Sequence, residues 1–98
     1  MKQLYSITRT EFYKKLLKNK KGWTIKRIQY TFQGLSYSYG FDAVQGHKTI
    51  QVEPITSLHR RTSFIVSYQN LENPSEDISK CHISFQDMQA IVNRIIYS

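Results

Sequence analysis

The C-terminal part of the chain carries a clear helical pattern. Its apolar residues recur at the spacing of one helix face: Met88, Ile91, Val92, Ile95 and Ile96. Ser84 and Asp87 precede them with the spacing of a capping box, in which side chains satisfy backbone donors at the start of a helix. The pattern predicts an amphipathic helix from about Phe85 to Tyr97.

A second amphipathic helix is predicted near the N-terminus, from about Arg9 to Lys20. Thr8 followed by Glu11 fits a capping box, and Gly22 suits the left-handed position that often follows a helix. One face of this helix is apolar: Phe12, Tyr13, Leu16 and Leu17. The opposite face gathers lysines: Lys14, Lys15, Lys18 and Lys21.

Alternating apolar and polar residues on both sides of Gln33-Gly34 predict a β-hairpin. Its expected register places three apolar pairs on one face: Ile28 with Tyr39, Tyr30 with Tyr37, and Phe32 with Leu35. The open sheet face would then carry polar groups: Arg27, Gln29, Ser36 and Ser38. Trp23 and Ile25 fall on the other parity, which implies a bulge near Lys26 and Arg27 or a later start of the strand.

The remaining elements are separated by turn-forming residues. They are predicted, in chain order, as a leading strand at Leu4–Ile7, a loop at Gly40–His47, a strand at Thr49–Glu53 that Pro54 ends or marks as an edge, a strand at Thr62–Gln69, an exposed loop at Leu71–Ser79 and a short strand at Lys80–Ser84. Hairpins and short connections favour an α+β fold, with an antiparallel sheet of about three to five strands and both helices packed on one face. The other sheet face would lie open to solvent.

Length and composition limit the classes of protein to consider. With 98 residues, the chain is expected to form a single domain over residues 1–98, with no second hydrophobic core. No apolar run approaches the roughly 20 residues of a transmembrane helix, and Met1–Tyr5 lacks the apolar segment of a secretory signal. The one cysteine, Cys81, cannot form an internal disulfide, so a cytoplasmic location without a membrane partner is expected.

Charge is distributed unevenly along the chain. The net charge is +7, yet residues 1–50 hold ten Lys and Arg against two acids, whereas residues 51–98 hold four against five. Lys20, Lys26 and Arg27 extend the lysine face of the first helix along the sequence. A one-signed surface of this kind attracts polyanions, and an ordinary solvated helix face is the competing interpretation.

The sequence contains no recognisable catalytic motif. A phosphate-binding glycine loop, a metalloprotease motif, a nucleophile elbow and a dinucleotide fingerprint are all missing. The strong metal-ligand residues lack the spacing of a zinc site: His47, His59, Cys81 and His82. Cys81 is expected to be a small buried hydrophobic residue and not a nucleophile. No metal, cofactor or catalytic residue is therefore predicted, and an enzyme is the minority interpretation.

Two further features have a functional and a structural interpretation. His59-Arg60-Arg61 could hold a phosphate or perform acid–base chemistry in a metal-independent ribonuclease, although a turn between strands is favoured. Four aromatic residues of the hairpin could stack on single-stranded bases, although packing beneath the helices is favoured: Tyr30, Phe32, Tyr37 and Tyr39.

Three functions remain open from the sequence. The first is a small basic non-enzymatic protein that binds nucleic acid or another polyanion through eight residues: Lys14, Lys15, Lys18, Lys21, Lys26, Arg27, Arg60 and Arg61. The second is an inhibitor or adaptor of the phage or mobile-element type that binds an acidic protein surface or a nucleoprotein enzyme, a class that includes anti-CRISPR proteins. The third is a small metal-independent ribonuclease that uses His59, Arg60 or a tyrosine. The sequence does not choose between DNA, RNA and protein as the partner, and it leaves the oligomeric state open.

Overall fold

The computed structural model describes residues 7–33, 35–56 and 62–97. Its elements are, in chain order, a 3-10 turn η1 (Ile7–Arg9), α1 (Glu11–Lys18), β1 (Thr24–Phe32), β2 (Leu35–Gln45), β3 (Lys48–Thr56), β4 (Thr62–Asn70), a 3-10 turn η2 (Pro74–Glu76), β5 (Ile78–Ile83) and α2 (Phe85–Ile96). The five strands form one antiparallel sheet in the order β1-β2-β3-β4-β5, so every strand lies beside its neighbour in the chain. The predicted α+β class is confirmed.

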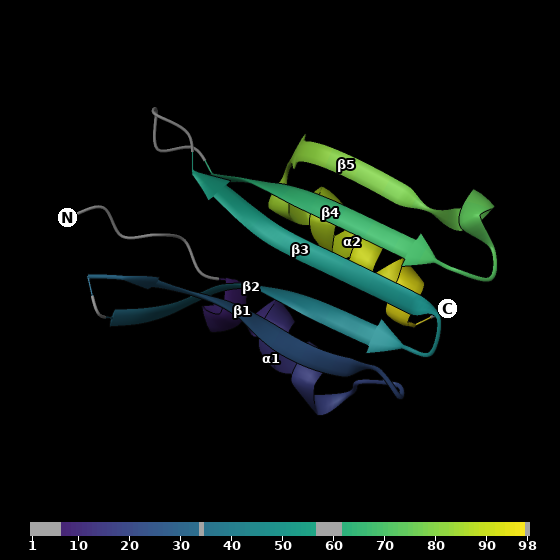
Figure 1. Ribbon diagram of the computed structural model, residues 1–98, viewed down its shortest axis with the longest axis horizontal. Helices are drawn as coiled ribbons and strands as arrows, with labels where there is room; N and C mark the ends of the chain where they lie inside the picture. Colours follow the sequence, from purple (N-terminus) through teal and green to yellow (C-terminus); the bar gives the residue numbers. More distant parts are fainter. Residues whose placement is uncertain (1–6, 34, 57–61, 98) are drawn as a thin grey trace.

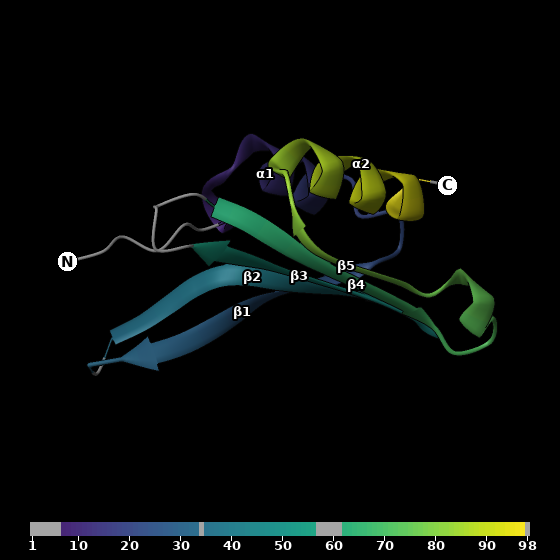
Figure 2. The same cartoon turned by 90° about the horizontal axis from the view of Figure 1, so that it is seen from above.

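Both helices cover the same face of the sheet, as predicted (Figures 1 and 2). α1 lies over the β1–β2 side and α2 over the β4–β5 side. Aromatic rings connect the layers. The centre of the Phe12 ring of α1 lies 6.4 Å from that of Phe41 of β2 and 6.0 Å from that of Phe85 of α2. Phe85 in turn lies 5.6 Å from Phe64 of β4, so one core runs between the sheet and both helices.

Alternate residues of the central strands supply the sheet's share of this core. The side chains that are at most 5% exposed are Phe41, Ala43, Ile50, Val52, Phe64, Val66 and Tyr68. The strand register brings them together across the sheet, since Phe41 pairs with Val52 and Val52 pairs with Val66. The predicted strand over Thr62–Gln69 is confirmed, with its apolar residues on the helix side.

α1 is shorter than predicted at both ends. Thr10, and not Thr8, caps its start: the Thr10 hydroxyl oxygen accepts a hydrogen bond from the Tyr13 amide at 3.2 Å. The helix ends at Lys18 with Asn19 as its C-cap, and Gly22 takes its left-handed conformation (φ 85°) in the turn that follows. The C-terminal helix and its Ser84 cap are confirmed, since the Ser84 hydroxyl accepts from the Asp87 amide at 3.1 Å.

The predicted β1–β2 hairpin is confirmed near its turn and differs further from it. Phe32 pairs with Leu35 and Tyr30 with Tyr37, as expected. A register shift between Ile28 and Gln29 then makes Ile28 pair with Gly40 and not with Tyr39. The expected irregularity therefore lies one to two residues beyond Lys26 and Arg27.

The segment predicted as a loop at Gly40–His47 is mostly strand. β2 continues to Gln45, because Phe41 and Ala43 alternate into the core and are both 0% exposed. β3 also runs past Pro54 to Thr56. The pairing of β2 with β3 stops at the Phe41–Val52 pair, so Pro54 lies on a local edge, where a missing N–H costs no hydrogen bond with β2.

The connection from β4 to β5 is more ordered than the predicted exposed loop at Leu71–Ser79. It contains η2, and β5 begins at Ile78 instead of Lys80. Asn70 is 7% exposed and holds this connection, since its Nδ2 donates to Glu76 Oε2 at 2.8 Å. The predicted leading strand at Leu4–Ile7 falls mainly outside the described residues, and Ile7 belongs to η1.

Candidate polyanion-binding surface

Helix α1 separates its apolar and cationic side chains. The inward face consists of three residues that are at most 6% exposed: Phe12, Tyr13 and Leu16. Three lysines are exposed on the helix: Lys14, Lys15 and Lys18. At about 100° of rotation per residue, the middle of the lysine set lies opposite the middle of the buried set. Core packing therefore fixes the direction in which the lysines point, as the sequence predicted.

Glu11 is the one acidic residue of α1 and lies on the same outward face. Its Oε1 is 3.4 Å from Lys14 Nζ, and the two side chains are 82% and 57% exposed. An exposed ion pair of this kind is weak and is screened by salt. Among the residues that the structure describes, Lys15 and Lys18 make no ion pair. The outward face of α1 therefore keeps most of its positive charge.

The turn after α1 adds two exposed lysines, Lys20 and Lys21. The turn is fixed from both sides: the Trp23 amide donates to the Lys20 carbonyl at 2.9 Å, and Gln45 Nε2 donates to the Lys21 carbonyl at 2.9 Å. Trp23 itself is 3% exposed and anchors the turn in the core. Lys21 was predicted on the helix face and instead lies in this turn, at the C-terminal end of α1.

Arg27 lies on the helix side of the sheet and not on the open face where the sequence placed it. It pairs with Phe41, a core residue of the helix-covered face. Its guanidinium carbon is 6.0 Å from the centre of the Tyr13 ring on α1, within the range of a cation–π contact. Arg27 is exposed at the free edge formed by β1, so its charge adds to that of the neighbouring helix.

Lys26 belongs to the opposite face of the sheet, because successive strand residues point to opposite sides. It pairs across the strands with Asp42. Burial raises the pKa of the Asp42 carboxyl, and the positive charge of Lys26 acts in the other direction and lowers it. The structure therefore separates Lys26 from the other predicted cations.

We call six exposed cations of α1, of the turn after it and of β1 the α1 cationic surface: Lys14, Lys15, Lys18, Lys20, Lys21 and Arg27. The remaining predicted phosphate contacts, Arg60 and Arg61, lie outside the described residues, as does His59. The side chains of four aromatic residues and three polar residues of the hairpin lie outside them too: Tyr30, Phe32, Tyr37, Tyr39, Gln29, Ser36 and Ser38. The stacking platform therefore stays a prediction.

Cys81 is exposed, which corrects the expectation that it is buried. It lies beside His82, whose backbone is left-handed (φ 57°) and whose Nδ1 is 3.4 Å from the Ser63 hydroxyl. Within residues 7–33, 35–56 and 62–97, no group of three or more His, Cys, Asp or Glu could hold a metal ion. Neither of the two α-helices in these ranges has the length and apolar character of a membrane-spanning segment.

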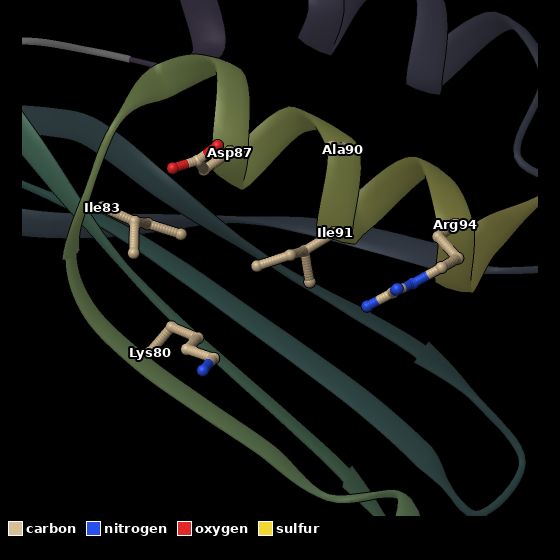
Figure 3. A pocket seen from close by; sticks show the side chains of 6 residues that line it. All are labelled: Lys80, Ile83, Asp87, Ala90, Ile91 and Arg94. Carbon is tan, nitrogen blue, oxygen red and sulfur yellow. The ribbon is translucent and has the colours of Figure 1, made fainter.

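A groove between β5 and α2 is a feature that the sequence pattern did not indicate (Figure 3). Its volume is about 430 Å³, and its walls bring together Lys80 and Ile83 of β5 with four residues of α2: Asp87, Ala90, Ile91 and Arg94. Neither helical spacing nor strand alternation predicts this grouping, because it depends on the position of β5 beside α2.

Comparison with protein-family models, with curated proteins and with solved structures gives no match. The α1 cationic surface can bind anions by charge.

Proposed function

We propose that this protein is a small non-enzymatic binding protein that holds the phosphates of a nucleic acid on the α1 cationic surface. The observation that carries the proposal is a set of six exposed cations on and beside one helix, whose one acidic residue is Glu11. Lysines act there as point charges, and Arg27 can donate two hydrogen bonds to one phosphate. Contacts of this type position a protein on the backbone and do not read the base sequence.

The length of α1 sets the scale of the interaction. Its eight residues span about 12 Å at roughly 1.5 Å per residue. Phosphates follow one another every 3.4 Å or so along one strand of B-DNA, so the helix covers about three or four of them. Each neutralised phosphate contributes about −0.9 to the slope of log K against log salt, so a slope of about −3 is expected. Affinity would then fall roughly 60-fold between 50 and 200 mM salt.

Two double variants test the site with equal changes of net charge. Lys15→Gln/Lys18→Gln removes two charges from the α1 cationic surface, and Lys80→Gln/Arg94→Gln removes two from the groove between β5 and α2. Glutamine has a helix propensity close to that of lysine and arginine, and Lys80 is an exposed residue of strand β5, so both variants should fold. Binding is measured by fluorescence anisotropy with a labelled 20-nucleotide RNA and a 20-base-pair DNA over a range of salt concentrations.

The α1 variant is expected to bind roughly 50-fold more weakly at 0.1 M salt, with a slope reduced by about 2. The groove variant should stay within about threefold of the parent protein, because distant charges are screened. Equal losses in both variants would mean that α1 is not the site. Absence of binding to both probes would overturn the proposal, and a nuclease-resistant protein partner would then favour the inhibitor or adaptor. Cleavage of RNA by the purified protein would show that it is an enzyme.

A further inference from the structure

The groove between β5 and α2 combines an apolar floor with two cations. Ile83 and Ile91 are half-buried and form the floor, while Lys80 and Arg94 are exposed on opposite walls. Figure 3 shows the Arg94 side chain turned back toward β5 and Asp87 near the Ile83 end of the groove. Within the described part of the chain, none of these three charged side chains makes an ion pair.

A β-bulge gives the groove its composition. Lys80 pairs with Val66 and Ile83 with Phe64, so two residues of β5, Cys81 and His82, face one residue of β4. Val66 and Phe64 both belong to the buried, helix-covered face of the sheet. Lys80 and Ile83 therefore lie on the helix side together, although residues three apart on a regular strand point to opposite faces. The bulge places a cation beside an aliphatic side chain at the foot of α2.

The openness of the groove indicates the kind of occupant that fits it. Four of its six lining residues are exposed, and only the two isoleucines are half-buried. A small molecule in such a groove would stay largely in solvent, whereas small-molecule sites bury about 70–90% of their ligand. A protein segment can cover the groove from outside and bury the isoleucines at the same time. Two cations against one carboxylate favour a segment that carries negative charge.

We infer that this groove docks an extended segment of a partner protein in which acidic side chains lie next to aliphatic ones. The aliphatic groups pack on Ile83 and Ile91, and the carboxylates bind Lys80 and Arg94. Side chains supply most of this recognition, because the bulge at Cys81 and His82 interrupts the edge of β5 and limits continuous pairing with another strand. The groove lies on α2 and β5, away from α1, so the protein can hold this partner and a nucleic acid together (Figure 1).

The probe is a fluorescein-labelled peptide of eight residues in which pairs of glutamates alternate with pairs of leucines, so that an extended chain presents both residue types on each face. Its binding to the full chain is measured by anisotropy, and its position is mapped by the shifts of backbone amide resonances. Saturable binding is expected, with the largest shifts in β5 and α2. Lys80→Gln/Arg94→Gln should weaken binding about tenfold or more, since each carboxylate loses a charge-assisted hydrogen bond. Lys15→Gln/Lys18→Gln, which changes the net charge equally, should change it less than twofold.

Control probes distinguish docking in the groove from general charge attraction. A glutamate–serine peptide is expected to bind at least tenfold more weakly than the glutamate–leucine peptide, because it cannot cover the isoleucine floor. Equal affinity for both peptides, or equal losses in the two double variants, would show attraction by charge alone and overturn the inference. It is equally overturned if decanoate or the 20-nucleotide RNA shifts the β5 and α2 amides while the glutamate–leucine peptide does not. The two proposals can fail separately, because each double variant is the control for the other.

Discussion

Gly40 lies in β2 directly against the backbone of β3. A Cβ atom at this position would be 2.4 Å from the carbonyl oxygen of Val52 and 3.3 Å from the Cα of Glu53. Both of these atoms belong to the main chain, so they cannot rotate away as the end of a side chain would. Gly40→Ala should therefore force β2 and β3 apart where their pairing ends.

The cost follows from the distance that the strands must move. Ordinary contacts of a Cβ atom begin near 3.4 Å, so about 1 Å of separation is required at the Val52 carbonyl. Overpacking of this kind costs about 1–3 kcal/mol, and the loss of one backbone hydrogen bond between β2 and β3 adds roughly 1 kcal/mol. Alanine also restricts the unfolded chain, which returns about 0.4–1 kcal/mol. The net loss should be about 1–3.5 kcal/mol, out of roughly 5–15 kcal/mol for a domain of this size.

Urea unfolding followed by circular dichroism measures this loss, and Gly46→Ala is the matched control. Gly46 has φ 57° and no atom within 4 Å of the added Cβ, so alanine there costs only the left-handed conformation. That cost is about 1–2 kcal/mol before the same gain from the unfolded chain. The Gly40 variant should unfold at a lower urea concentration than the Gly46 variant. If its midpoint equals or exceeds that of the control, the close approach of β2 to β3 is not a constraint on the fold.

Two further predictions concern single polar residues. Asn70→Ala removes the hydrogen bond to Glu76 and should lower the free energy of unfolding by about 1–3 kcal/mol. Hydrogen exchange of the amides between β4 and β5 should accelerate in this variant. Unchanged exchange there would show that Asn70 does not hold this connection. Because burial raises the folded-state pKa of Asp42 above its ordinary value of 3.8, ionisation of Asp42 destabilises the fold as pH rises through this range. Asp42→Asn should therefore stabilise the protein at pH 7 and lose this advantage as the pH falls below 3.8, and a constant difference in unfolding free energy across pH would contradict this cause.

Elements with strong local signals were predictable from the sequence. α2 combines a capping serine with a continuous apolar stripe, and local and tertiary preferences agree there. β4 likewise alternates between apolar and polar residues along its length, and its buried positions follow the expected parity. The outward direction of the α1 lysines also follows from one helix and its period alone.

Elements that depend on distant partners were not predictable in the same way. Gly40, Asp42 and Gly46 are turn-forming residue types, so the second half of β2 reads locally as a loop. It is a strand because burial of Phe41 and Ala43 on the helix-covered face of the sheet outweighs that local preference. α1 ends early for the opposite reason, since no apolar residue after Leu17 reaches the core until Trp23, and lysine propensity alone does not extend the helix.

The position of Arg27 shows how the assignment of β1 residues to one face of the sheet changes a predicted site. Assigning Ile28 to the core face places Arg27 on the open face, yet the half-buried Ile25 and its partner Ala43 set the opposite parity. Trp23 and Ile25 already conflicted with the predicted register in the sequence. This conflict indicated that the first half of β1 has the opposite parity. Arg27 consequently lies on the same side of the sheet as the lysines of α1, whereas Lys26 lies on the opposite side beside Asp42.

The groove between β5 and α2 could not be found from strand periodicity, because it exists only through a break in that periodicity. In a regular strand, Lys80 and Ile83 would face opposite sides of the sheet, and the cation would not lie above the apolar floor. The extra residue of the bulge, with His82 in the left-handed region, places Ile83 on the same side of the sheet as Lys80. A left-handed histidine at an exposed edge costs conformational energy without filling the core. The feature that it produces is the alignment of Lys80 with Ile83 opposite Arg94, which is the alignment that an acidic–aliphatic segment requires.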